Sequence, residues 1–167
     1  NPANEEALLA NAFVNLEMKK LDAAKNYFTR VYELNPKNLK AINQLMELTY
    51  SYRQFAKATE LAQQCKECEN SLRIIGMSAY QQEDYPAAEK SLKAAVAKHP
   101  EDAEAIYTLA RTYLDMEEYN KAIPWFEKAI KQPNAKNTWM YELGLLYYNQ
   151  SDYKNASNAF NMAADNG

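Results

Sequence analysis

The stretch AEAIYTLARTYLDMEEYNKAIPWFEKAIKQPNAK, residues 103–136, decides the fold of this chain. Its apolar residues recur at helical spacings and are interrupted once, at residues 116–118, which predicts two amphipathic helices joined by a short turn. One such pair cannot bury both of its apolar faces, so it needs neighbouring pairs. The rest of the sequence supplies them, because it repeats the same pattern in register along its length.

The pattern predicts five units placed end to end: residues 5–38, 39–68, 69–102, 103–136 and 137–167. First helices are expected near residues 5–17, 38–51, 71–82, 102–116 and 137–150, and second helices near 21–33, 54–67, 85–98, 119–132 and 153–164. The second unit is shorter than those on either side and lacks the loop with its proline, so its joint with the third unit is expected to be irregular. In that unit Met46 stands where a small residue is usual and Ala62 where an aromatic is usual, an exchange that we expect to conserve core volume.

This pattern resembles the tetratricopeptide repeat, a motif with small, aromatic and proline residues at fixed places and a period of about 34 residues. The matching residues are the small residues Ala12, Gly76, Ala110 and Gly144, the alanines Ala24, Ala58, Ala88, Ala122 and Ala156, the aromatics Phe28, Phe126 and Phe160, and the prolines Pro36 and Pro100. The resemblance implies an all-α fold, a right-handed superhelix (solenoid) of stacked antiparallel helix hairpins. A single solenoid domain over residues 1–167 is expected.

Both ends of the sequence are expected to be open. Pro2 stands one full repeat before Pro36, at the last position of a unit that is not present. At the other end Ala156, Phe160 and Ala163 are expected to face a following helix. Because solenoid ends need polar caps for solubility, the sequence is expected to be a piece of a longer array, or to self-associate through its uncapped C-terminal helix.

The composition argues against several classes of protein. A hydrophobic fraction of 47% excludes disorder. A net charge of -3 and a pI near 5.3 argue against a nucleic-acid surface and against an anionic membrane surface. Membrane insertion is not expected, because no apolar run long enough to span a bilayer occurs. The compartment is left unassigned.

No residue pattern points to catalysis. Cys65 and Cys68 form a C-x-x-C, but we expect them at the end of a helix, where the dipole disfavours a thiolate, so buried packing is the first interpretation and a redox or metal role the second. They are too close for a long-range disulfide, and zinc would need two more ligands, since His99 is expected in a distant solvated turn. Without a phosphate loop or a nucleophile elbow, we expect no catalytic residue, metal, cofactor or enzyme activity.

The resemblance also implies a binding face, because the first helices of such repeats line a concave groove. Tyrosine and arginine most often carry binding energy at protein interfaces. The predicted partner-binding residues are therefore Asn43, Glu47, Tyr50, Arg73, Met77, Tyr80, Tyr107, Arg111, Tyr141 and Tyr148. The alternative is that these tyrosines only pack over their neighbours along the inner wall.

The charge of the groove predicts the chemistry of the partner. The implied groove positions hold three basic residues (Lys40, Arg73, Arg111) and six acidic ones (Glu6, Glu17, Glu47, Glu104, Asp115, Glu142). Family members that bind the acidic tails of heat-shock chaperones use a two-carboxylate clamp, and no three consecutive units here supply its residues. The predicted partner is a protein or peptide that is not strongly anionic, with aromatic, apolar and some basic side chains.

The leading functional hypothesis is a non-catalytic scaffold for protein–protein interaction that holds a peptide or a partner surface in this groove. Two alternatives remain open. The chain could be a structural module that self-associates, or a regulatory or docking region of a larger enzyme.

Overall fold

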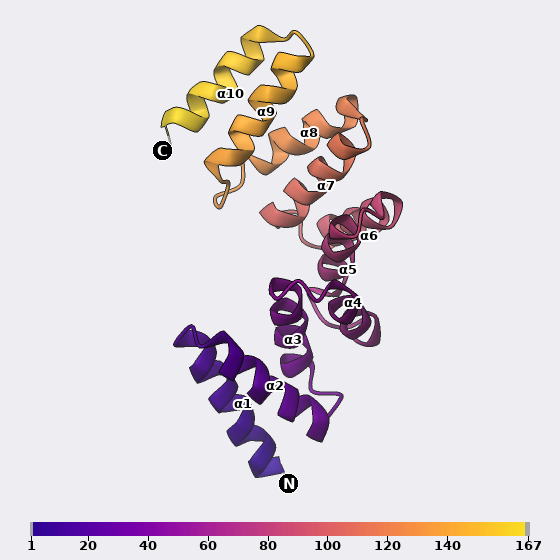
Figure 1. Cartoon of the computed structure of the whole chain (residues 1–167), viewed down its shortest axis with the longest axis vertical. Helices are drawn as coiled ribbons and strands as arrows, with labels where there is room; N and C mark the ends of the chain where they lie inside the picture. Colours follow the sequence, from indigo (N-terminus) through magenta and orange to yellow (C-terminus); the bar gives the residue numbers. More distant parts are fainter. Residues whose placement is uncertain (1, 166–167) are drawn as a thin grey trace. The chain divides into compact units, whose positions relative to one another are not determined.

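The computed structural model describes residues 2–165, which form ten α-helices and, within that range, no strand. The helices are α1 (Pro2–Glu17), α2 (Leu21–Leu34), α3 (Leu39–Ser51), α4 (Phe55–Gln64), α5 (Ser71–Gln81), α6 (Tyr85–Lys98), α7 (Ala103–Asp115), α8 (Tyr119–Ala129), α9 (Asn137–Asn149) and α10 (Tyr153–Asp165) (Figure 1). Connections of a few residues join consecutive helices. The predicted all-α fold is confirmed.

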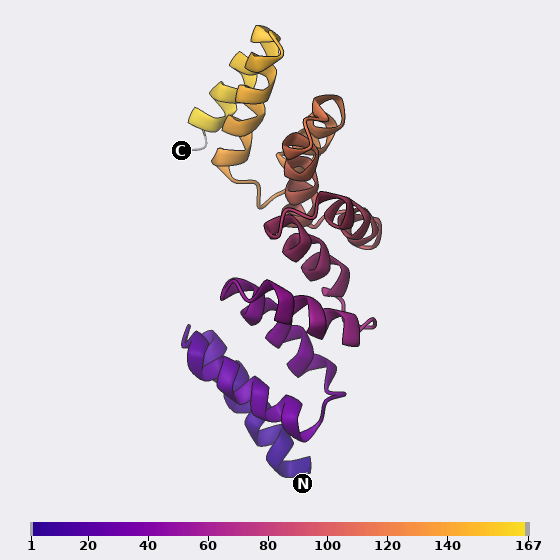
Figure 2. The same cartoon turned by 45° about the vertical axis from the view of Figure 1, so that its right-hand side comes forward.

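Contacts divide the chain into two compact units, Asn1–Gln82 and Glu83–Gly167. In the first unit α2 packs against α1 and α3, and α4 packs against α3 and α5. In the second unit α7 packs against α6 and α8, and α9 packs against α8 and α10 (Figure 2). Each unit is thus a stack in which a helix contacts its neighbours in the sequence. A single continuous solenoid domain stays a prediction.

A left-handed residue lies in the turn that follows each of α1, α3, α5, α7 and α9. Lys19, Arg53, Glu83, Glu117 and Ser151 have φ between 57° and 62°. Such a residue lets the backbone reverse at a helix end, and the Glu118 amide, for example, donates to the Tyr113 carbonyl at 2.8 Å across the turn. These residues are evenly spaced along the sequence except between Arg53 and Glu83, which lie closer together than the others. The short interval coincides with the short helix α4, and residues 65–70 still connect α4 to α5, so the expected absence of an inter-unit loop is not observed.

The core consists of the residues that the repeat pattern places between helices. Ala12, Ala110, Phe28 and Phe126 are fully buried, and Met46 and Ala62 are also fully buried. Phe160, on the last described helix, is only half-buried. The compensation of volume between Met46 and Ala62 stays a prediction.

Three helix boundaries differ clearly from those predicted. The first helix begins at Pro2 rather than near residue 5, so Pro2 opens a helix instead of lying in an inter-unit turn as Pro36 does. Proline suits the first turn of a helix because its missing N–H would have no partner there. In addition, α4 ends at Gln64 rather than near residue 67, and α8 ends at Ala129 rather than near residue 132. The chain after each of these two helices turns earlier than the periodicity suggested.

Because α4 ends before Cys65, both cysteines lie in the turn that follows the helix. Cys65 follows the helix directly, the Cys68 amide donates to the Cys65 carbonyl at 3.1 Å, and the two Cα atoms lie 5.3 Å apart across this turn. Both residues are buried, as expected, but they form a disulfide, which the sequence did not predict. The prediction was wrong because it extended the helix to residue 67, past Cys65, whereas the chain already turns there. The Ser71 hydroxyl, at the start of α5, donates to the Cys65 carbonyl and joins this turn to the next helix.

Reduction of this disulfide is expected to lower the free energy of unfolding by about 1–2 kcal/mol, because the closed loop is short and loop-closure entropy grows only slowly with length. Urea unfolding followed by circular dichroism, with and without dithiothreitol, measures this difference. The Cys65→Ala/Cys68→Ala variant serves as the control and should not respond to dithiothreitol. An equal response in that variant would contradict the assignment.

Candidate functional site

In the first unit the predicted groove residues come from α3 and α5, which contact each other. Glu47 of α3 forms an ion pair with Arg73 of α5, and both side chains are mostly buried. Arg73 Nη1 also lies 3.8 Å from the sulfur of Met77, which is buried. These three predicted residues are therefore brought together, and the charge of Arg73 is already balanced by a carboxylate.

The remaining predicted residues of the first unit are half-buried. The Tyr50 ring lies 5.5 Å from the ring of Phe55, at the start of α4. Tyr80 is half-buried near the end of α5. The Asn43 Oδ1 atom is buried and has no hydrogen-bond partner among the residues that the structure describes. Tyr50 therefore combines a packing contact with a partly exposed surface.

In the second unit Tyr107 is held on three sides. Its ring stacks on Trp139 of α9 at 4.4 Å with an interplanar angle of 9°, and it makes a T-shaped contact with Phe126 of α8 at 5.8 Å. Its hydroxyl donates to the Glu142 carboxylate, 2.9 Å from both oxygens. Burial raises the pKa of Tyr107 to about 12, and the negative charge of Glu142 acts in the same direction. Tyr107 thus positions Glu142.

Arg111, one helical turn after Tyr107, binds the same carboxylate. Its Nη1 atom lies 3.4 Å from both Glu142 oxygens, and its Nη2 atom lies 3.9 Å from Asp115. The two residues that the sequence placed in the middle of the groove therefore form a network with Glu142 on the neighbouring first helix. Tyr107 and Arg111 therefore hold the Glu142 carboxylate in place on α9.

The exposed part of this face is an aromatic stripe on α9, which we define as Tyr141, Leu145 and Tyr148. Their successive spacing of about one helical turn places them on one side of the helix. They are 52%, 39% and 57% exposed, far more than an apolar core position of a helix. Tyr141 leans on Phe160 at 5.5 Å and Tyr148 on Tyr153 at 5.6 Å, so α10 supports the stripe.

A pocket of about 790 Å³ lies beside the stripe, and we call it the α7–α9 pocket. Its apolar wall consists of Leu114, Leu145 and Leu146, and Tyr119 adds an aromatic side chain. Its charged groups are Arg111 and the carboxylates Asp115, Glu117 and Glu142. Leu145 belongs to both the stripe and the pocket, so the two form one continuous surface.

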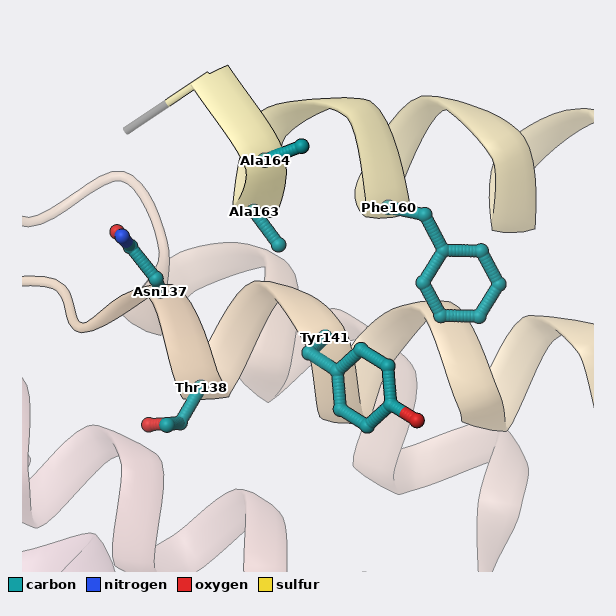
Figure 3. Close-up of a pocket in the computed structure, with 6 residues that line it drawn as sticks. All are labelled: Asn137, Thr138, Tyr141, Phe160, Ala163 and Ala164. Atoms are coloured by element: carbon teal, nitrogen blue, oxygen red, sulfur yellow. The ribbon is translucent and has the colours of Figure 1, made fainter. Parts of the chain in front are cut away.

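A second hollow of about 570 Å³ lies between α9 and α10 and is almost entirely apolar. Figure 3 shows its lining, with Tyr141 and Thr138 on one helix and Phe160, Ala163 and Ala164 on the other. We call it the α9–α10 pocket. It is open to solvent because, among the described residues, no later helix packs against α10.

The predicted partner-binding residues include Tyr141 and Tyr148 of this surface but not Leu145 or Trp139. Leu145 is also an implied groove position, but nothing in a single sequence distinguishes an exposed leucine from a buried one. The stacking of Tyr107 on Trp139 was also missed, because the two residues lie far apart in the sequence and on different repeats. Tyr107 and Arg111 carry the right side chains for contact, and whether they touch a partner stays a prediction.

Residues 2–165 hold neither a metal-binding cluster nor a membrane-spanning helix. No group of three or more histidine, cysteine, aspartate or glutamate side chains there is arranged to hold a metal ion. None of the helices in this range has the length and apolar character of a membrane span.

Solved structures with the same fold include several repeat proteins. MamA from Desulfovibrio magneticus RS-1 superimposes with a TM-score of 0.81 at 19% identity, over 97% of this chain and 94% of that one. PilF from Pseudomonas aeruginosa gives 0.81 at 20% identity, over 99% and 78%. YrrB, a TPR protein with an unusual peptide-binding site, gives 0.70 at 15% identity, over 95% and 84%. At these identities the similarity concerns the fold alone.

Similarity in sequence identifies the family. The chain is 30% identical over 139 residues to DnaJ homolog subfamily C member 3 of Gallus gallus, an alignment that covers 83% of this chain and 25% of that protein. The chain thus spans a quarter of the length of this relative. Family models described as tetratricopeptide repeat match residues 6–38, 75–136 and 107–167. The chain therefore belongs to the tetratricopeptide repeat (TPR) family, whose members bind proteins or peptides and are generally non-catalytic.

Proposed function

We propose that this chain is a non-catalytic scaffold that binds a partner polypeptide along the exposed faces of its first helices. The observation that carries the proposal is the aromatic stripe of α9, where three large apolar side chains remain exposed next to a pocket. Exposed tyrosines with fixed rings are typical interface anchors, because they lose little conformational entropy on binding. The description of YrrB as a TPR protein with a peptide-binding site supports the same role by analogy.

The partner that we propose is not strongly anionic. Arg73 is paired with Glu47, and Arg111 lies between Glu142 and Asp115. An acidic segment would have to displace these internal carboxylates, which removes much of the gain from a new ion pair. A segment with aromatic, apolar and basic side chains would leave both networks in place.

Selection of short random peptides displayed on phage tests this function. Peptides selected against the wild-type chain should bind the Tyr141→Ala/Tyr148→Ala variant about tenfold more weakly or worse, since truncated interface anchors cost more than about 1.4 kcal/mol. The matched control is Leu21→Ala/Leu34→Ala, which removes exposed apolar side chains from the second helix α2. Selection of no peptide at all, or equal loss of binding in both variants, would contradict the proposal.

The alternative of self-association has an observation of its own, the apolar α9–α10 pocket. In this second candidate function, a second copy of the chain covers the α10 side of this pocket, at Phe160, Ala163 and Ala164. Light scattering should then show a concentration-dependent oligomer that Phe160→Glu abolishes without loss of helical content. A monomer at all concentrations would exclude this role.

A further inference from the structure

We infer that the α7–α9 pocket accepts an arginine or lysine side chain of the partner segment that lies on the aromatic stripe. The inference rests on the proposed function and adds the class of side chain that the site recognises. It starts from the composition of the pocket wall, which combines a leucine-lined side with an excess of carboxylates. An apolar side chain would leave the carboxylates without a cation, and an acidic side chain would be repelled by them.

The charges in the pocket leave an unbalanced negative potential. Arg111 is the single cationic residue of the lining, against Asp115, Glu117 and Glu142. Glu142 already accepts from the Tyr107 hydroxyl and lies beside Arg111, so most of its charge is balanced within the protein. Asp115 lies 3.9 Å from Arg111, and the exposed Glu117 makes no ion pair with another described residue, so the lining as a whole keeps more carboxylates than cations. A cationic guest would therefore meet Asp115 and Glu117.

The apolar wall suits the rest of such a guest. Arginine and lysine place three or four methylene groups between backbone and charge, and these pack on apolar surface while the charged end reaches a polar group. Leu114, Leu145 and Leu146 provide that surface beside the carboxylates. A guanidinium can also donate two hydrogen bonds to one carboxylate, so arginine is expected to be the preferred guest.

The stripe fixes where the neighbouring residues of the guest lie. Leu145 lines the pocket and stands between Tyr141 and Tyr148 on the same face of α9. A partner segment that inserts its basic side chain beside Leu145 therefore places flanking side chains on the two tyrosines. Aromatic or aliphatic side chains of the partner are expected to pack on the rings of Tyr141 and Tyr148. The recognised segment thus combines one basic side chain with apolar neighbours.

The test compares short random peptides on phage selected against four proteins. These are the wild-type chain, the neutralised variant Asp115→Asn/Glu117→Gln, the reversed variant Asp115→Lys/Glu117→Lys, and the control Glu67→Gln/Glu69→Gln. The control removes the same charge from exposed positions outside the pocket. Circular dichroism verifies that all four keep their helical content. A wild-type binder is then also synthesised with citrulline, the neutral isostere, in place of its arginine.

The wild-type chain and the control should select peptides enriched in arginine or lysine beside apolar residues, and the reversed variant should lose that enrichment. The arginine peptide should bind the neutralised variant about 5- to 10-fold more weakly than the wild-type chain, and the citrulline peptide should bind both alike. Peptides that depend on Tyr141 and Tyr148 but show no basic enrichment, or the same enrichment in the reversed variant, would overturn the inference and leave the proposed function standing. Selection of no peptide would overturn both.

Discussion

The Phe126→Ala variant is expected to unfold with a free energy about 3–5 kcal/mol lower than that of the wild-type chain. Phe126 is fully buried on α8, and its ring makes a T-shaped contact with the ring of Tyr107 on α7. Truncation removes the apolar surface of the ring and leaves a cavity between helices that are already closely packed. The loss should also loosen Tyr107, which positions Glu142 on the candidate binding face.

Urea unfolding followed by circular dichroism measures this effect, and Leu34→Ala is its control. Leu34 is about half exposed at the end of α2, so its truncation should change the free energy of unfolding by no more than about 0.5 kcal/mol. Equal costs for the two variants would show that Phe126 does not carry the packing assigned to it. Near-ultraviolet circular dichroism of Phe126→Ala should in addition report a change at Trp139, on which Tyr107 stacks.

The second large effect is expected at Gly144, the small residue of α9 that faces α10. A Cβ atom built on Gly144 would lie 2.5 Å from Cε1 and 2.6 Å from Cδ1 of Phe160, closer than atoms can approach without a shift. Gly144→Ala should therefore destabilise the chain by about 1–3 kcal/mol, the usual cost of overpacking. Because alanine in a helix interior gains up to about 1 kcal/mol over glycine, the net loss is expected toward the lower end of this range.

The sign of the effect should reverse once the obstructing ring is removed. In a Phe160→Ala background, Gly144→Ala has no aromatic ring to meet and should stabilise the chain by up to about 1 kcal/mol. The four proteins of this double-mutant cycle, compared by urea unfolding, isolate the contact between the two residues. Stabilisation by Gly144→Ala in the wild-type background would mean that Phe160 moves aside without cost.

The sequence was sufficient for the fold because each element of the repeat has a local cause. Helical spacing of apolar residues defined the hairpins, and small residues such as Ala12 and Ala110 had to be buried for helices to approach closely. The ends of the helices were harder to predict, since the spacing of apolar residues continues past the point where the backbone turns. The disulfide between Cys65 and Cys68 depended on that missed boundary and so could not be anticipated.

The candidate site was less predictable than the fold, because its contacts join residues of different repeats. Position in the repeat identified Tyr107 and Arg111 as inward-facing, but their interaction with Glu142 depends on how α7 stacks against α9. The exposed fraction of a predicted site residue also depends on packing between repeats, which a single sequence does not show. Tyr107 is covered by Trp139, whereas Tyr141, at the equivalent position of the next repeat, leans on Phe160 and stays half exposed.

Site-resolved photocrosslinking tests the central claim that partners bind on the first-helix face most directly. The photoreactive residue p-benzoylphenylalanine replaces Leu145 in the stripe or, in the control, the exposed Asn158 on α10. A peptide selected against the wild-type chain should crosslink at position 145, lose that product when unlabelled peptide competes, and give no specific product at position 158. A competed crosslink at position 158 with none at position 145 would contradict the account.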